Sequence, residues 1–302
     1  MSDLACKVRG LPPEFLVPEA ELLPELRRLV VPSSESRDRG RAAPGQRRLA
    51  LLLAFDGTDW AGWQLQENAR SIQGELEAAW RRVTGSPIRL TGCSRTDAGV
   101  HARCHLSHFD SAARIPLERI PLALNAQLPP SITVRAAYEV APDFHARFDC
   151  IEKTYAYQIW NGPKPSPFEG RWLATEPLPL DTADMRLALP CLLGTHDFTS
   201  FRAAGSETKT SVRTLTAARL EVEARPDGRL LRLIVTGSGF LYNMMRIIAG
   251  TLVAVGRGEL EPLAVATIMH ARDRRLAGKT MPPGGLILER IRYRSPAADN
   301  GG

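Results

Sequence analysis

The sequence predicts an α+β fold made of two units, in each of which helices back a mainly antiparallel sheet. The chain has 302 residues, which is too long for one ordinary domain and comfortable for two. It is 44% hydrophobic and 24% charged, a balance that excludes a disordered, collagen-like or disulfide-stapled chain. Strand-like apolar runs also mix with helical patterns twice along the chain, which is typical of helix-backed sheets.

Residues 1–46 are predicted to be an N-terminal extension. A short helical pattern within 11–31 is interrupted by prolines, and residues 33–45 run through Ser, Arg, Gly and Pro without periodicity. We therefore interpret this segment as a flexible appendage, either an arm that binds a partner or the product of an upstream start codon.

Organised sequence begins at Arg47. The apolar run Leu49–Phe55 has the length of a buried strand and ends at a turn signal, Asp56-Gly57-Thr58. Ser71 is suited to cap a helix that begins at Ile72 and ends at Gly85, because Ile72, Leu76, Trp80 and Val83 fall at helical spacing. The other elements predicted in this half are strands over 88–91 and 100–109, a helix over 117–124 and a strand over 133–140.

The second half repeats this mixture without a strict sequence repeat. The apolar run Phe240–Val255 predicts a buried helix. The other elements predicted are a strand over 155–159, a helix over 182–193, a strand pair over 214–224 and 229–236, a helix over 263–270 and a last strand over 286–292.

The charge balance is basic and is carried by arginine. Of 39 basic residues only five are Lys, against 33 acidic residues, which gives a net charge of +6. The guanidinium group matches phosphate geometry, so this surplus suits an anionic partner. Charge alone, however, is explained more simply by a compositional bias of the genome, and it leaves the question open. The paired arginines Arg47–Arg48 and Arg81–Arg82 are interpreted as solvated charges.

The five cysteines are scattered and form no CxxC pair, which favours a reducing compartment. The start of the chain does not resemble a signal peptide, and the apolar run 240–255 is too short to span a bilayer. We therefore expect a cytoplasmic protein.

The most informative segment is the polar loop that begins at Cys93 and runs to Ala102. It places a carboxylate, Asp97, two residues from a guanidinium, Arg95, and Gly99 allows a tight turn beside them. Loops held by a sheet often carry reactive groups. Spacing alone favours a structural role instead, in which the aspartate accepts hydrogen bonds from turn amides beside a solvated arginine.

Residues 94–102 resemble the catalytic loop G-R-T-D-A-G-V-H-A of TruA-type tRNA pseudouridine synthases, with Ser94 in place of the first glycine. The likeness covers about residues 47–295. Seven further segments resemble motifs of this family in the same order: Phe55-Asp56-Gly57-Thr58 with Gly62-Trp63-Gln64, Gln73-Gly74-Glu75-Leu76-Glu77, Phe144-His145-Ala146-Arg147-Phe148, Lys153-Thr154-Tyr155-Ala156-Tyr157, Gly194-Thr195-His196-Asp197-Phe198, Gly239-Phe240-Leu241-Tyr242-Asn243-Met244-Met245-Arg246, and Pro282-Pro283-Gly284-Gly285-Leu286.

The resemblance implies two RRM-like (ferredoxin-like) domains with mainly antiparallel sheets packed side by side and an active cleft between them. The domains would span 47–146 and 147–296, with a tail over 297–302. It also implies isomerisation of uridine to pseudouridine at positions 38, 39 and 40 of the tRNA anticodon stem-loop, without cofactor or metal, by a homodimer that grips one tRNA.

The same resemblance assigns the site residues. Asp97 matches the essential aspartate, which acts either as a nucleophile or as the base that removes the ribose 2′ proton. Arg246 would be its ionic partner, and a charge in the apolar helix 240–255 needs such a partner on physical grounds. Tyr155 would stack on the target base, and its hydroxyl would take the ring proton at the end of the reaction. Leu286 would form an apolar wall against the base, and Arg95 would occupy the place of the extruded base.

Three positions depart from the family pattern. Ser94 replaces a glycine, which matters if the backbone there needs a positive φ. Phe55 stands where tyrosine is usual, and Lys153 replaces an arginine. None of these changes removes a group assigned to catalysis, so they bear on rate or RNA affinity rather than on reaction type.

Two other functions compete with this interpretation. One is an RNA-binding or RNA-chaperone protein that has the fold but no turnover. The other is a zinc enzyme, because His101, Cys104, His105 and His108 would share one face of a helix. We expect a strand there instead, in which 101 and 105 point away from 104 and 108.

Overall fold

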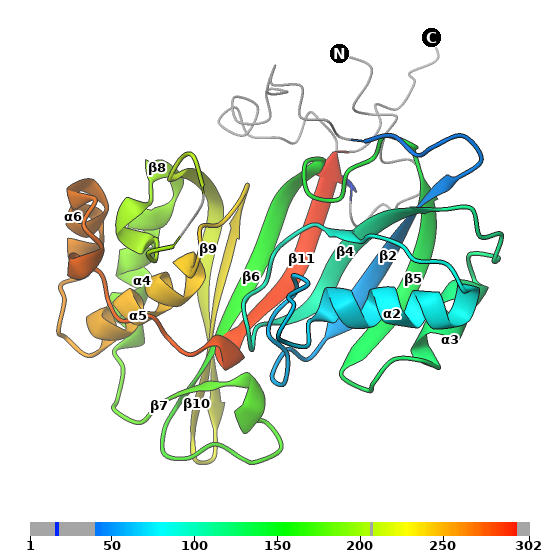
Figure 1. The fold of residues 1–302 in the computed structure, drawn as a ribbon. Helices are drawn as coiled ribbons and strands as arrows, with labels where there is room; N and C mark the ends of the chain where they lie inside the picture. Colours follow the sequence, from blue (N-terminus) through cyan, green and yellow to red (C-terminus); the bar gives the residue numbers. More distant parts are fainter. Residues whose placement is uncertain (1–15, 18–39, 206–207, 295–302) are drawn as a thin grey trace, which may run out of the picture. The chain divides into compact units, whose positions relative to one another are not determined.

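The computed structural model describes residues 16–17, 40–205 and 208–294. These form two compact units, one from the described residues up to 152 together with residues 290–294, and the other from the described residues between 153 and 289 (Figure 1). The chain passes from one unit to the other within strand β6 (Cys150–Asn161) and again within strand β11 (Leu286–Arg294). Helices combine with mainly antiparallel strands in both units, which confirms the predicted α+β class.

The first unit is built on three antiparallel strands in the order β5–β2–β4. Strand β2 (Arg47–Phe55) lies between β4 (His101–Ser111) and β5 (Ile132–Val140), and residues 290–294 of β11 follow beside β4. A short strand, β3 (Thr91–Gly92), pairs with β4. Strand β1 (Leu16–Val17) runs parallel to the end of β11. The central strand β2 is buried almost throughout, and this explains why its sequence is a continuous apolar run.

Helix α2 (Ile72–Thr84) begins and ends where its sequence signals predict. The Ser71 hydroxyl accepts a hydrogen bond from the Gly74 N–H, and Gly85 adopts the left-handed conformation at φ 74°. Figure 1 shows α2 beside α3 (Arg119–Asn125), which contacts β5. Trp80 of α2 packs edge-on against Phe109 of β4 with ring centroids 4.7 Å apart, so the helix covers the core face of the sheet.

The second unit has the strand order β6–β10–β9–β8, and every neighbouring pair in this series is antiparallel. Strand β9 (Val212–Arg225) and strand β10 (Gly228–Gly237) form the predicted hairpin, and β8 (Gly194–Asp197) forms the edge. Strand β7 (Ala174–Glu176) runs parallel to β6. Neither β7 nor β8 was expected, because both are too short to show a clear alternation.

Three helices pack in this second unit: α4 (Thr182–Ala188), α5 (Met244–Gly256) and α6 (Ala264–Ala271). Helix α5 is buried over most of its length, as predicted. It begins at Met244 rather than at Phe240, because Asn243 has φ 59° and cannot be part of a right-handed helix. None of the helices within the described residues is long and apolar enough to cross a membrane.

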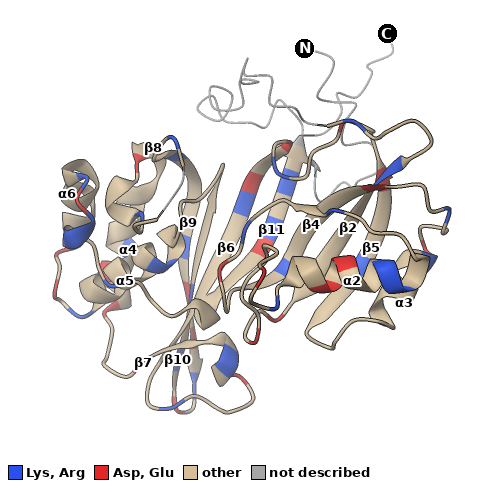
Figure 2. Ribbon diagram, in the orientation of Figure 1, with Lys and Arg blue, Asp and Glu red and all other residues tan. Residues whose placement is uncertain are grey.

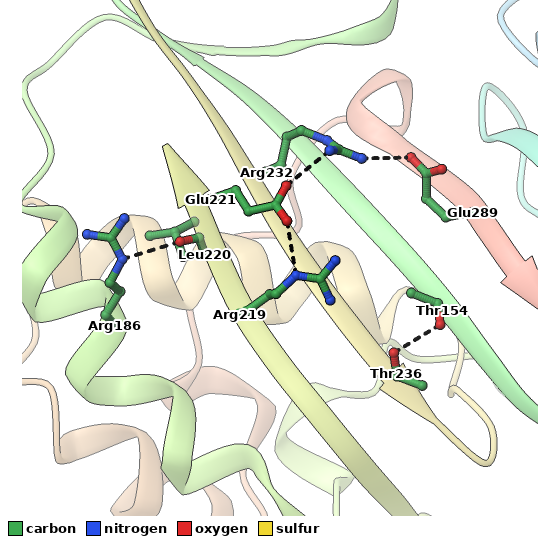
Figure 3. Close-up of polar contacts among 8 residues, drawn as sticks. All are labelled: Thr154, Arg186, Arg219, Leu220, Glu221, Arg232, Thr236 and Glu289. Carbon is green, nitrogen blue, oxygen red and sulfur yellow. Dashed lines mark hydrogen bonds and ion pairs between the residues drawn. The ribbon is translucent and has the colours of Figure 1, made fainter. Parts of the chain in front are cut away.

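One face of the second unit's sheet carries a row of alternating charges (Figure 3). Arg232 of β10 reaches Glu221 of β9 at 3.0 Å and Glu289 of β11 at 3.3 Å. Thr154 and Thr236 share a hydrogen bond of 2.9 Å across the β6–β10 pair. Because side chains alternate along a strand, Tyr155 and its partner Val235 face the opposite side, where Val235 is fully buried.

Opposite charges also lie together on α2 (Figure 2), where Arg82 pairs with Glu75 at 3.1 Å. Arg48 overturns the expectation that the paired arginines are solvated. Its side chain is only 3% exposed, and both Nε and Nη2 donate to the carboxylate of Asp110. A guanidinium in β2 is buried because a carboxylate on the neighbouring strand satisfies it.

Two further expectations are corrected. The strand predicted over 88–91 is reduced to β3 at Thr91–Gly92, since the Leu90 N–H donates to the Glu77 side chain rather than to a strand. The helical pattern within 11–31 lies outside the described residues except at Leu16 and Val17. These two residues form a strand, so the helix prediction is wrong there.

Candidate active site

The loop that carries Asp97 is fixed by its backbone. The Trp63 N–H donates to the Thr96 carbonyl at 3.0 Å, and the Gly99 N–H donates to the Trp60 carbonyl at 3.2 Å. The Val100 N–H closes the turn on the Asp97 carbonyl at 3.1 Å. Asp97 therefore sits between two anchored neighbours, and its side chain is half-buried at the surface of the first unit.

Gly62 allows the segment Trp60–Trp63 to pack closely against this loop. Its φ is 96°, which L-residues with a Cβ rarely adopt. A Cβ at this position would lie 2.5 Å from the Thr96 carbonyl oxygen and 3.0 Å from the Asp97 carbonyl carbon. The glycine of the Gly62-Trp63-Gln64 segment is thus required by a close backbone approach to the aspartate loop.

Aromatic stacking holds the start of the same loop. The rings of Trp63 and His105 stack with centroids 3.9 Å apart, and His105 Nε2 lies 3.0 Å from the Ser94 carbonyl oxygen. Ser94 does not have a positive φ, so the residue that departs from the family glycine imposes no left-handed strain. Phe55 is buried beside Trp63, with ring centroids 6.4 Å apart. Arg95 is exposed.

Tyr155, Arg246 and Leu286 all belong to the second unit. Tyr155 lies on β6, is 6% exposed, and packs edge-on against Phe240 with centroids 4.9 Å apart. Leu286 begins β11 directly after the 3₁₀ turn Pro283–Gly285 and is also 6% exposed.

Arg246 is half-buried in the first turn of α5, and two neutral oxygens hold its guanidinium group. Nε donates to the Met281 carbonyl at 2.6 Å, and Nη1 donates to Asn243 Oδ1 at 2.7 Å. The positive charge of Arg246 also acts on Tyr157. Burial raises the pKa of the Tyr157 phenol well above its usual value, and Arg246 opposes that shift. Tyr157 therefore stays protonated and donates to the Pro282 carbonyl at 2.6 Å.

Sequence reasoning missed the residues that support Arg246. Asn243, Tyr157 and the segment 277–282 hold or flank its guanidinium. Although Asn243, Tyr157 and Pro282 lie within the motifs quoted above, none of them was assigned a role. The available signal was the i, i+3 spacing of Asn243 and Arg246 at the start of a predicted helix. That signal is weak, because the same spacing is common where no hydrogen bond forms.

The His and Cys residues of β4 lie on a strand, as predicted, and not on a helix. His105 packs on Trp63, whereas His108 packs against Phe144 and accepts a hydrogen bond from the Ala146 N–H. Burial raises the pKa of the Cys104 thiol to about 11, which disfavours the thiolate that binds metals. Within residues 40–205 and 208–294, no three His, Cys, Asp or Glu side chains come together as a metal site would require.

The sequence profile of a family described as tRNA pseudouridine synthase matches residues 52–149 and 188–294. The chain is 43% identical over 247 residues to tRNA pseudouridine synthase A of Geobacillus kaustophilus, a match that covers 82% of this chain and 94% of the relative. It is 45% identical to tRNA pseudouridine synthase A of Brevibacillus brevis, covering 82% of this chain and all of the relative. Among solved structures, one chain in a crystal structure of the archaeal box H/ACA sRNP Nop10–Cbf5 complex aligns over 80% of this chain and 48% of that chain. The TM-score is 0.31 and the identity is 9%, a likeness too low to bear on function.

Proposed function

Because the chain belongs to the tRNA pseudouridine synthase family and is therefore a tRNA-modifying isomerase, we propose that it acts at positions 38, 39 and 40 of the anticodon stem-loop, with Asp97 as the essential carboxylate. The observation that carries the proposal is the aspartate loop itself. Its sequence matches the family's catalytic loop, and two hydrogen bonds to the Trp60–Trp63 segment, with a third inside the turn, hold its backbone in place.

The reaction needs little from the protein beyond acid–base groups. The bond between ribose C1′ and uracil N1 breaks, the uracil turns, and a bond forms between C1′ and C5. The proton on C5 is lost and N1 gains one, so atoms and electrons balance without a redox partner. Asp97 acts as an ionised carboxylate, either attacking the substrate or removing the ribose 2′ proton.

The remaining site residues serve that carboxylate and the extruded base. Arg246 pairs with Asp97 and keeps it anionic, since a nearby cation lowers a carboxyl pKa. Tyr155 stacks on the uracil, and its hydroxyl takes the ring proton at the end of the reaction. Leu286 forms an apolar wall. Arg95, which is exposed beside Asp97, fills the space that the base leaves in the stem.

We also propose the architecture that the family resemblance implies. The two units described above are both RRM-like, and the protein works as a cytoplasmic homodimer that grips one tRNA. Light scattering coupled to size exclusion, with and without tRNA, tests the assembly. A protein mass of one chain per particle in both samples contradicts the dimer.

The substitution Asp97→Asn tests the catalytic assignment. It keeps the shape of the side chain and removes its charge, so we expect pseudouridine formation to fall below detection while tRNA affinity stays within about tenfold. Pseudouridine is mapped at positions 38–40 of an unmodified tRNA transcript, and affinity is measured by filter binding. The matched control Asp227→Asn changes an exposed aspartate in the β9–β10 turn and should leave both values unchanged.

Two outcomes contradict the assignment. Activity in Asp97→Asn within about tenfold of wild type removes Asp97 from the chemistry, and a large loss of tRNA affinity assigns it to binding or folding. If the wild-type chain binds tRNA tightly and forms no pseudouridine, it is instead an RNA-binding protein without turnover.

A further inference from the structure

Asn243 combines a rare backbone conformation with an unusual hydrogen bond. Among the described non-glycine residues, only Asn243 and Arg272 have a positive φ. Asn243 precedes the first residue of α5, where an asparagine ordinarily has extended dihedrals and caps the helix with its side chain. Here the side chain makes no cap hydrogen bond.

Two other helices, α2 and α4, show the ordinary arrangement. Ser71 before α2 is extended and accepts from the Gly74 N–H, and Asp181 before α4 is extended and accepts from two backbone N–H groups. The Oδ1 atom of Asn243 instead accepts from Nη1 of Arg246 at 2.7 Å. The left-handed backbone has thus turned the side chain away from the helix end and toward the guanidinium.

A second support holds the other edge of the same guanidinium. The Met281 carbonyl accepts from Arg246 Nε, and the Met281 N–H donates to the Arg246 carbonyl at 3.2 Å. Met281 lies in residues 277–282, here called the strap. The strap is fixed farther along α5, where the Gly278 N–H donates to Thr251 Oγ1 at 2.9 Å, and at its end, where Tyr157 donates to Pro282.

The acceptors from Met281 and Asn243 are both neutral, so they orient the guanidinium of Arg246 without compensating its charge. A carboxylate at position 243 would orient the guanidinium equally well but would also compensate its charge. A neutral amide and a carbonyl fix Nε and Nη1 while leaving the net positive charge to act on another group. Such support suits an arginine that must face an anion.

We propose that Asn243 is a positioning residue that acts through Arg246, holding its guanidinium in the direction the reaction needs without neutralising it. This inference rests on the proposed role of Arg246 as the partner of the reacting carboxylate. Asn243 is suited to the task because asparagine tolerates the left-handed conformation better than most residues and still supplies an oxygen acceptor.

The test compares three variants at position 243 and a control elsewhere. Asn243→Gly removes the acceptor and favours the observed φ, so we expect an unchanged or raised melting temperature, a kcat about 10- to 100-fold lower, and a KM within about threefold. Asn243→Ala should lose the same kcat and also melt lower. Asn243→Asp should keep the melting temperature and lose kcat, because its charge compensates Arg246. The control Arg272→Gly relieves the other positive φ and should keep the wild-type kcat.

Two readouts separate an effect through Arg246 from a general structural effect. In an Arg246→Lys background, measured by single turnover, Asn243→Gly should change the rate less than about twofold, because the guanidinium that Asn243 orients is already absent. The guanidinium Nε–H signal of Arg246, assigned by its loss in Arg246→Lys, should exchange with water at least about tenfold faster in Asn243→Gly.

The outcomes distinguish this inference from the proposed function. A wild-type kcat in Asn243→Gly, with unchanged Nε–H exchange, overturns the positioning role. Equal fold losses from Asn243→Gly in the wild-type and Arg246→Lys backgrounds overturn it too, because the effect then does not pass through the arginine. Wild-type turnover in Arg246→Lys contradicts the proposed role of Arg246 itself.

Discussion

The loop that carries Asp97 and the first turn of α5, which carries Arg246, are held in different ways. In the first unit, backbone hydrogen bonds fix the residues on both sides of Asp97, and the side chain plays no part in those bonds. In the second unit, Arg246 has an ordinary helical backbone, and its guanidinium is fixed by bonds to Asn243 and Met281. Backbone hydrogen bonds therefore fix the loop around Asp97, whereas side-chain hydrogen bonds fix the guanidinium of Arg246.

This difference follows from the length of the two side chains. An aspartate has two rotatable side-chain bonds, so fixing its backbone places the carboxylate closely. An arginine has four, and fixing its backbone leaves the guanidinium free to sweep through several ångströms unless its nitrogens are also held. We therefore expect the first region to be sensitive to backbone changes and the second to changes in hydrogen-bond acceptors.

The largest effect is expected where the backbone support of Asp97 is broken. Gly62→Ala places a Cβ 2.5 Å from the Thr96 oxygen and demands a φ of 96°, so it should cost about 3 kcal/mol of unfolding free energy and at least about 100-fold in turnover. Urea denaturation and single-turnover assays measure the two quantities.

Gly85→Ala is the matched control for this substitution. Gly85 also has a positive φ, 74°, but a Cβ there meets nothing within 4 Å. Gly85→Ala should lower the free energy of unfolding by only about 1 kcal/mol and leave turnover within about twofold of wild type. Equal effects from both substitutions contradict the view that Gly62 is needed for its approach to the aspartate loop.

Acid should weaken the first unit through His108 of β4. Burial lowers the pKa of His108 to about 3, and His145 and Arg48 add to the shift while Asp110 opposes it. The unfolded chain therefore takes up a proton near pH 6.5 and the folded chain only near pH 3, so stability present above pH 6.5 is lost as the pH falls. Between about pH 6.5 and pH 5 the loss should be about 2 kcal/mol.

His108→Asn removes this titration and keeps an acceptor for the Ala146 N–H. Its first unit should lose about 2 kcal/mol less than that of wild type over the same pH interval, measured as amide hydrogen exchange of peptides from residues 40–152. The same pH dependence in both proteins shows that another group is responsible. Peptides from residues 153–289 should respond equally in both.

The smallest effect is expected at the strap, and its sign is informative. A Cβ at Gly250 of α5 would overlap the Lys279 carbonyl oxygen. Alanine is a better helix former than glycine by about 1 kcal/mol. If the strap could shift away from the new Cβ at no cost, Gly250→Ala would therefore raise the free energy of unfolding. We expect a net loss of about 1 kcal/mol instead, with a lower kcat, because the strap carries the Met281 acceptor of Arg246. A rise in melting temperature contradicts this.

The sequence predicted much of the fold because its signals are local. Ser71 and Gly85 bound α2 where capping chemistry places them, and the apolar run of β2 reads as a strand buried on both faces. The start of α5 was misplaced by four residues, because no propensity shows that Asn243 turns left-handed in order to reach Arg246. Arg48 was taken as solvated, because its partner Asp110 lies 62 residues away in the sequence.

The sequence by itself determined the α+β class and the order of most elements, and its resemblance to the family's motifs indicated the residues on which isomerisation is proposed to depend. These depend on periodicity and on residue types, which are written along the chain. Only the tertiary structure decided how those residues are supported: Gly62 against the Asp97 loop, and Asn243 and the strap on Arg246. Most of this support comes from contacts between segments far apart in sequence, which residue spacing does not reveal. The local contact of Asn243 with Arg246 depends on a backbone angle that the weak i, i+3 signal does not predict.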